Sequence, residues 1–502
     1  MRIVINITND SSVSYALLVL DKLKDNDDFR VLAICYTNSI KEKLIKLDVN
    51  NLVDKIITQE DIGLPNNNYQ LSNKDVLKIE EIESNYSRNS IWNYVNQDRI
   101  LSYTKRGFLY NNGTSFSRPV LVKTILNRFD VIKEIISDFN PDIVKYITQD
   151  FGTSISSVLY EVAKSKKIPI IIPVVAKFNN YYSFNDNIYG PFDELEKTYN
   201  ENIVNKKFKV SEETKVELNE YVFNSKLAFY VVKEKQKKST FIYTIFKSVF
   251  NFIISIFNYT IKKEKGFLTT NLWYYAFDKL TVFYRALITK RDIHFLKIKD
   301  LENTKYLYFP LHYEPELVLL TQSQTYSDQL NVIKNISQNL PLNTQLVVKD
   351  HPLMFGRRKS DFYKTILGVP NVVLVESTEN SIEIIKLSFG VITIIGSVGM
   401  EAFFHNKPAI TLSNAFYNFL PSVKKVKSFH EISNEVLEFE NYKFDDNEKL
   451  ILIETIKELS IAINLNHLIR KLDQGKINNL EKEELKDFLD FLYKNINAKL
   501  VH

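Results

Sequence analysis

Short apolar runs alternate with segments of helical spacing along the first 180 residues. The apolar runs predict strands at 3–7, 29–35, 142–148 and 168–173, and the helical spacing predicts helices at 14–24, 131–139 and 154–165. Near-continuous apolar strands separated by helices are typical of a parallel sheet that is covered on both faces. The first part of the chain is therefore predicted to be a Rossmann-like α/β domain.

The same rhythm returns in the second half. Strands are predicted at 305–310, 344–349, 372–376, 390–395 and 407–412, with helices at 327–339, 361–367, 381–387 and 399–404. We expect an α/β protein with two Rossmann-like domains that face each other across a cleft and a helical insertion between them. The expected parts are an N-terminal acceptor domain at 1–200, a helical linker or insertion at 201–300, a donor domain at 301–450 and C-terminal helices at 451–502. Ligands of such sheets bind at the carboxyl ends of the strands.

The segment 239–261 carries only one charged residue, Lys247. Its length is close to the roughly 20 residues that cross a bilayer. However, its apolar and polar positions fall on opposite helical faces, and basic clusters flank it at 233–238 and 262–265. This pattern is typical of an amphipathic helix at an anionic membrane surface. The alternative is a helix that packs on the protein's own core or on a second subunit; a membrane span is disfavoured.

Composition narrows the class of protein. Of 502 residues, 45% are hydrophobic and 25% are charged, which is typical of soluble globular domains. A net charge of +5 over this length does not indicate a nucleic-acid binder. The single cysteine, Cys35, excludes disulfides within the chain and cysteine metal clusters, and its place in an expected strand favours simple packing. The first residues do not resemble a secretory signal, so we expect a cytoplasmic protein.

Candidate chemistry gathers just after three of the predicted strands. After 390–395, Gly396 and Gly399 would let the backbone approach a ligand, Ser397 supplies a hydroxyl at a helix start, and Glu401 can accept hydrogen bonds from ribose hydroxyls. By itself this segment is weak evidence for a ligand site, because glycine also ends strands for structural reasons.

The second segment follows 344–349. Lys349 and His351 can together neutralise a diphosphate or a leaving monophosphate, and Pro352 fixes the turn that presents them. An ordinary surface loop is the alternative. In the third segment, His312, Glu314 and Glu316 would line the cleft or brace the hinge, and Glu316 is expected to begin a helix.

Together, the segments 308–316, 348–352 and 393–402, with Lys407 and Pro408, resemble bacterial capsular polysaccharide and surface-carbohydrate biosynthesis proteins of the GT-B glycosyltransferase architecture. The resemblance covers about residues 305–420. The chain has Lys-Asp-His-Pro where the family usually shows Lys-Glu-His-Pro, a change that keeps the charge.

This resemblance implies a nucleotide-sugar donor in the C-terminal domain. Similar His-Pro segments occur in bacterial sialyltransferases and in the Kdo transferases of capsule assembly, whose donors are CMP-sugars. By that analogy His351 contacts the donor phosphate, Ser397 supports it and Glu401 holds the ribose.

The resemblance also implies that the N-terminal domain supplies a general base or nucleophile, which would be an acid beyond a strand end that faces the cleft. Asp150 fits that position best, and Asp10 and Asp98 are weaker candidates. The expected donor domain at 301–450 has no Asp-x-Asp segment that would hold a divalent ion, so we expect no metal and no cofactor, with leaving-group stabilisation by Lys349, His351 and a helix N-terminus.

The resulting hypothesis is a metal-independent glycosyltransferase that moves a sugar, with a CMP-sugar favoured as donor, to a surface or capsular polysaccharide. Its partners would be a nucleotide-sugar, a glycan or lipid-linked glycan acceptor and an anionic membrane surface, without nucleic acid. Two alternatives remain. One is a teichoic-acid type transferase with a CDP-linked polyol phosphate as donor, and the other is a non-catalytic capsule export or scaffold protein.

Overall fold

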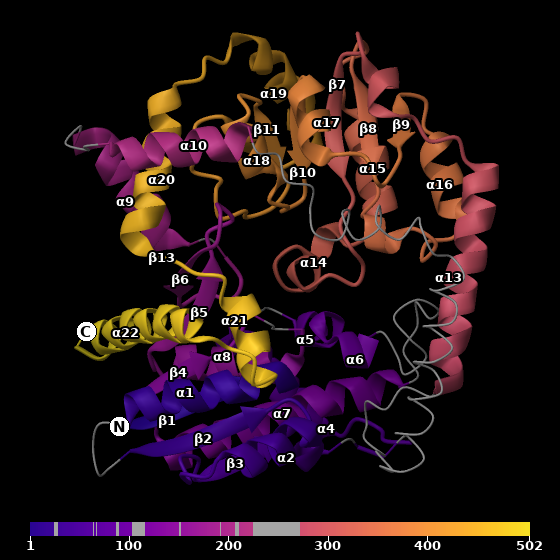
Figure 1. Ribbon diagram of the computed structural model, residues 1–502. Helices are drawn as coiled ribbons and strands as arrows, with labels where there is room; N and C mark the ends of the chain where they lie inside the picture. The colour runs from indigo at the N-terminus through magenta and orange to yellow at the C-terminus, as the bar shows by residue number, and fades with distance from the viewer. Residues whose placement is uncertain are drawn as a thin grey trace. The chain divides into compact units, whose positions relative to one another are not determined.

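The computed structural model describes residues 1–502 except 25–28, 64, 67, 87–89, 103–115, 150–151, 191, 206–209, 224–271 and 502. The chain forms two compact units (Figure 1). Unit 1 contains Met1–Tyr103, Gly113–Phe192 and Thr455–His502, and unit 2 contains Asp193–Glu454. The predicted helix at 239–261 lies outside the described residues.

Unit 1 is built on a seven-stranded sheet in the order β13-β6-β5-β4-β1-β2-β3. The strands are β1 (Arg2–Ile7), β2 (Arg30–Cys35), β3 (Lys55–Thr58), β4 (Ile143–Tyr146), β5 (Ile170–Val175), β6 (Tyr181–Asn185) and β13 (Ile461–Ala462). The five strands from β5 to β3 pair in parallel, as predicted, and β6 and β13 extend the edge in antiparallel fashion.

Helices cover this sheet because its strands are apolar on both faces. They are α1 (Val13–Leu23), α2 (Asn38–Leu47), α3 (Gln59–Ile62), α4 (Asn73–Asn85), α5 (Ile91–Gln97), α6 (Arg99–Ser102), α7 (Arg118–Phe139) and α8 (Ser154–Ser165). Helix α7 begins earlier than the predicted 131–139 and ends as predicted, where Asn140 adopts the left-handed conformation with φ 45°.

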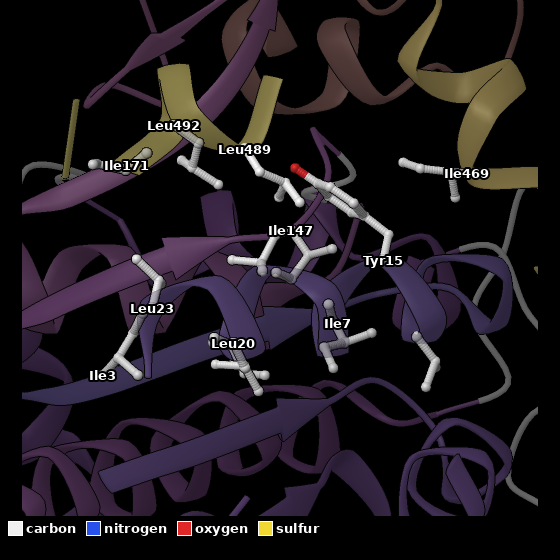
Figure 2. Close-up of a cluster of buried hydrophobic side chains, with 14 of the residues drawn as sticks. Ile3, Ile7, Tyr15, Leu20, Leu23, Ile147, Ile171, Ile469, Leu489 and Leu492 are labelled. Carbon is white, nitrogen blue, oxygen red and sulfur yellow. The ribbon is translucent and has the colours of Figure 1, made fainter. Parts of the chain in front are cut away.

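The C-terminal helices complete the core of unit 1. Helices α21 (Leu465–Asp473) and α22 (Asn479–Val501) place apolar side chains against β1, α1 and β5 (Figure 2). In α22 the buried positions Leu485, Phe488, Leu489, Leu492 and Ile496 recur at helical spacing. The end of the chain, which the sequence analysis set apart as 451–502, therefore packs on the first sheet from Thr455 onward.

Unit 2 contains a six-stranded, fully parallel sheet in the order β12-β11-β10-β7-β8-β9. The strands are β7 (Tyr306–Pro310), β8 (Gln345–Lys349), β9 (Val372–Val375), β10 (Gly390–Thr393), β11 (Ala409–Thr411) and β12 (Val423–Lys425). The helices are α9 (Asp193–Asn205), α10 (Glu212–Phe223), α13 (Leu272–Asp292), α14 (Leu317–Gln322), α15 (Gln329–Gln338), α16 (Ser360–Leu367), α17 (Ser381–Leu387), α18 (Val398–Phe404) and α19 (Ile432–Glu438), and α20 (Asp446–Leu459) leads into unit 1.

The predicted α/β class with two Rossmann-like sheets is thus confirmed, and the predicted cleft between them stays a prediction. Within the described part of the chain, no helix combines the length and apolarity needed to cross a membrane. Cys35 is buried at the end of β2, and burial raises the pKa of its thiol to about 12, consistent with a packing role.

Candidate functional site

The three segments that the sequence analysis selected follow β7, β8 and β10. These strands are neighbours in the sheet of unit 2, with β7 between β10 and β8. All three strands run in parallel, so their carboxyl ends lie at one edge. Residues 311–316, 350–352 and 394–397 are therefore brought together, as predicted from the sequence.

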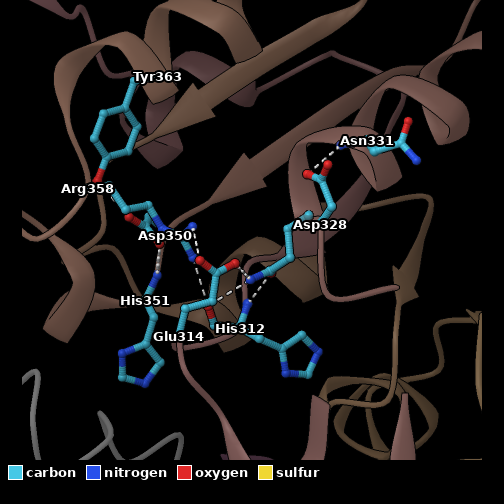
Figure 3. Close-up of polar contacts among 9 residues, drawn as sticks. His312, Glu314, Asp328, Asn331, Asp350, His351, Arg358 and Tyr363 are labelled. Atoms are coloured by element: carbon cyan, nitrogen blue, oxygen red, sulfur yellow. Dashed lines mark hydrogen bonds and ion pairs between the residues drawn. The ribbon is translucent and has the colours of Figure 1, made fainter. Parts of the chain in front are cut away.

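A buried cluster centred on Arg358 joins the segments after β7 and β8. The guanidinium donates through Nη1 to Glu314 at 2.9 Å, through Nε to Asp350 at 3.3 Å and through Nη2 to the carbonyl of His312 at 3.0 Å (Figure 3). The Tyr363 hydroxyl donates to the other Asp350 oxygen at 2.6 Å. Arg358 is 6% exposed, and Asp350 and Glu314 raise its pKa against the opposing effect of burial. We call these residues the Arg358 cluster.

His312 is held in place along its backbone. Its N–H donates to Gln329 Oε1 at 2.7 Å, and its carbonyl accepts from Gln329 Nε2 at 3.2 Å. Asp328 caps α15 by accepting from the backbone N–H of Asn331 at 3.2 Å, which sets Gln329 at the first helical position (Figure 3). Glu316 begins α14 as predicted, and its carboxylate lies 2.5 Å from Nδ1 of His312.

His351 follows Asp350, a member of the Arg358 cluster. Its N–H donates to Asp350 Oδ1 at 2.8 Å, and its ring Nδ1 accepts from the backbone N–H of Leu353 at 3.2 Å. Pro352 begins the short 3-10 helix that follows, so it fixes the turn as expected. Burial lowers the pKa of His351, and the nearby carboxylate of Asp350 opposes that shift. The rings of His351 and His312 both point away from the cluster, to the same side (Figure 3).

Lys349 is almost fully buried at the end of β8, where its Nζ donates to Ser381 Oγ at 2.8 Å. Burial lowers its pKa to about 8, while the carboxylates of Glu401, Asp350 and Glu379 favour the charged form. One N–H of the ammonium is thus used in the bond to Ser381 of α17. The ammonium also lies close enough to Glu401 for that carboxylate to raise its pKa.

The turn after β10 is organised internally. Ser397 donates to Glu401 at 2.8 Å, and the Tyr417 hydroxyl donates to the carbonyl of Gly396. A Cβ on Gly399 would lie 2.6 Å from the Tyr417 ring, so close packing accounts for this glycine. A Cβ on Gly396 would instead lie 3.5 Å from the His312 ring, so Gly396 is the glycine that meets the segment after β7. Ligand contacts of Ser397, Gly399 and Glu401 stay predictions.

The candidate bases have different outcomes. Asp150 lies outside the described residues, and Asp10 is exposed. Asp98 is fully buried and accepts from Arg128 Nη1 at 2.6 Å and from the backbone N–H of Ser154 at 2.9 Å. It therefore serves as the carboxylate of a buried ion pair, which argues against a role as base. In the part of the chain that the structure describes, no three His, Cys, Asp or Glu side chains are grouped to hold a metal ion.

Arg358, Gln329 and Tyr363 are parts of this site that the sequence analysis did not identify as functional. Their signal in the sequence is weak, because their partners lie 8 to 46 residues away along the chain. A buried arginine within a polar loop cannot be distinguished from a surface arginine without the tertiary contacts.

The chain matches solved structures at low sequence identity. Solved structures with a similar course of the chain include a UDP-GlcNAc 2-epimerase from Neisseria meningitidis bound to UDP-GlcNAc, with 14% identity, a TM-score of 0.28 and coverage of 96% of this chain and 100% of that one. KpsC, a beta Kdo 2,7 transferase from Thermosulfurimonas dismutans, has 12% identity and a TM-score of 0.28, covering 68% of this chain and 98% of that one. Scores this low carry no argument about chemistry.

No curated protein sequence matches the chain. The model of the family described as "Capsule polysaccharide biosynthesis protein" matches residues 220–425, which include β7 to β12 and all three site segments. The resemblance inferred from the sequence is confirmed for this region, because residues 220–425 match the model of the capsule polysaccharide biosynthesis protein family.

Proposed function

We propose that the chain is a glycosyltransferase of capsule or surface polysaccharide assembly that takes a nucleotide-sugar, with a CMP-sugar favoured, as donor. The observation that carries the proposal is the shared edge of β10, β7 and β8, where the three strands of the matched family region end in segments that carry Gly396, His312 and His351. Ligands of parallel α/β sheets bind at this edge. The donor phosphate would lie against His351 and Lys349, and the ribose near Glu401.

Donor binding is the first test. Calorimetry with CMP, CDP and UDP should detect binding by the full chain, and His351→Ala should weaken that binding by about tenfold or more, since a charge-assisted hydrogen bond is lost. His294→Ala is the matched control, because His294 is an exposed histidine of the same unit. If CDP binds better than CMP, the teichoic-acid type transferase gains; if no nucleotide binds at millimolar concentration, only the scaffold protein remains.

The base is a separate part of the proposal. We assign it to Asp150, which follows β4 in the order of the chain. Asp150→Asn should abolish sugar transfer and leave nucleotide affinity unchanged, because the residue would act on the acceptor hydroxyl. Retained turnover in Asp150→Asn would exclude this role.

We also propose that the leaving phosphate is stabilised by side chains and requires neither a metal ion nor a cofactor. Transfer by the purified chain should then be unaffected by EDTA. A loss of transfer that Mg²⁺ or Mn²⁺ restores would refute this part alone.

A peripheral contact with an anionic membrane, through the basic clusters around 239–261, completes the proposal. Liposome flotation would compare the native chain with a variant that has Lys237, Lys238, Lys262 and Lys263 changed to Glu. The native chain should float with anionic liposomes and the variant should not, whereas equal partitioning would exclude an electrostatic contact.

A further inference from the structure

One buried nitrogen at the edge formed by β10, β7 and β8 is not used in any hydrogen bond of the described structure. His312 is 9% exposed, and its Nε2 is buried without a hydrogen-bond partner in the described structure. Buried ring nitrogens are normally paired, because leaving one unpaired costs about 1–3 kcal/mol. The unpaired atom therefore calls for a ligand or for a structural reason.

The remaining polar groups of His312 are all committed. Its N–H and carbonyl are bound by Gln329, the carbonyl also accepts from Arg358, and Nδ1 lies 2.5 Å from Glu316 Oε2. The side chain is thus fixed in position and direction by contacts from three segments. A histidine whose side chain is held in one orientation by several hydrogen bonds is typical of a binding site. A histidine that only fills space does not need these contacts.

Glu316 also determines the chemistry of the ring. A carboxylate at this distance accepts the Nδ1–H, which leaves Nε2 as the ring nitrogen that can meet a ligand. With a proton on each nitrogen, as an imidazolium, the ring donates from Nε2 as well as from Nδ1.

The surroundings of Nε2 favour an anion. Nε2 faces Gly396, since a Cβ built on that glycine would lie 3.7 Å from Nε2. Backbone without a side chain therefore lies on this side of the ring. Glu316 and His312 both lie close enough to His351 to affect its pKa. Of the acidic groups nearby, Glu316 contacts the ring at Nδ1, whereas Asp350 and Glu314 are bound within the Arg358 cluster, on the opposite side from the two rings (Figure 3).

We propose that His312, oriented by Glu316, donates as an imidazolium from Nε2 to a phosphate oxygen of the nucleotide donor. This inference rests on the proposed function. His312 is then a second imidazole on the phosphate, from the strand next to that of His351, and Glu316 is a positioning residue that accepts the Nδ1–H.

The test is the pH dependence of CMP, CDP and UDP binding by the full chain, measured by calorimetry from pH 6 to 8.5. His312→Gln should weaken binding by about 10- to 100-fold at pH 6, with a smaller loss at pH 8.5, because a neutral imidazole that gives its one proton to Glu316 has none on Nε2 to donate. Glu316→Gln should weaken binding less than His312→Gln does, because it removes the orienting contact and leaves Nε2 in place. His351 and Lys349, whose pKa values are also shifted at this edge, are retained in these variants. His294→Gln, at an exposed position, should match the native chain.

The position of the ring proton can be followed by NMR of chains labelled at histidine, with the His312 signal identified by its loss in His312→Gln. The nitrogen shifts should show a proton on Nδ1 in the native chain, and this preference should be lost in Glu316→Gln. This measurement needs no nucleotide and no activity, and it remains informative if His312→Gln does not fold, because the signal can then be assigned through His351→Ala and His294→Gln together with the other single-histidine variants.

The outcomes separate the two levels of the proposal. If the native chain binds none of the three nucleotides, the proposed function fails. If it binds but His312→Gln binds equally well at every pH, the phosphate contact is refuted and the proposed function stands. Nitrogen shifts of His312 that Glu316→Gln does not change refute the pairing, and a loss of binding in His312→Gln that is the same at all pH values assigns the residue a structural role instead.

Discussion

Lys145 is a basic side chain in an apolar place. It lies on β4, in the middle of the unit 1 sheet, and is fully buried. Its Nζ has no hydrogen-bond partner in the described structure and lies 4.8 Å from the centre of the Phe184 ring. Burial lowers its pKa from 10.5 to about 7. We predict that Lys145→Met, which keeps the length of the side chain and removes the charge, stabilises the protein.

The size of the effect follows from the two pKa values. The unfolded chain binds a proton near pH 10.5 and the folded chain only near pH 7, so between these values the unfolded state carries more protons and stability rises with pH. Each pKa unit corresponds to about 1.4 kcal/mol, so the penalty reaches about 5 kcal/mol below pH 7 and vanishes above pH 10.5. The contact with Phe184 offsets about 0.5–2 kcal/mol of it. A gain of about 3 kcal/mol in Lys145→Met at pH 7 is expected.

Urea unfolding at pH 7, 8 and 9.5, followed by circular dichroism, measures this gain. The difference between Lys145→Met and the native chain should be largest at pH 7 and should shrink by about 1.4 kcal/mol per pH unit toward pH 9.5. Lys46→Met, on the exposed face of α2, is the control and should change stability by less than about 0.5 kcal/mol. A destabilised Lys145→Met, or a difference that does not change with pH, would refute the reasoning.

Three further predictions concern packing and reactivity. Asp98→Ala should lower the free energy of unfolding by about 3–5 kcal/mol in urea titrations, because it leaves Arg128 charged and buried, and the double variant Asp98→Leu with Arg128→Met should recover most of that loss. Gly399→Ala should cost about 1–3 kcal/mol by calorimetric unfolding, since its Cβ would meet the Tyr417 ring, and a neutral result would mean that the turn is free to move. Cys35 should resist iodoacetamide at pH 8 in the native chain and react in urea; rapid labelling of the native chain would contradict its burial.

The fold was largely predictable from local pattern. Strands that are buried on both faces appear in the sequence as apolar runs. The helices between them appear as apolar positions at helical spacing. For example, the predicted helices at 154–165 and 381–387 agree with α8 and α17 residue for residue. The return of α21 and α22 to unit 1 was not predictable in the same way, because a helical pattern shows which face is apolar but not which sheet covers it.

The site was predictable where chemistry follows directly from the end of a strand. His312, Lys349, His351 and Gly396 lie within three residues of β7, β8 or β10, so the parallel sheet alone brings them to one edge. What holds them there depends on contacts that do not follow from the order of strands. Arg358 reaches back 46 residues to the carbonyl of His312. The strand ends therefore determine which groups face a ligand, and the Arg358 cluster determines how firmly they are held. If His312 binds phosphate as proposed, loss of Arg358 should weaken nucleotide binding without removing any group that touches the nucleotide.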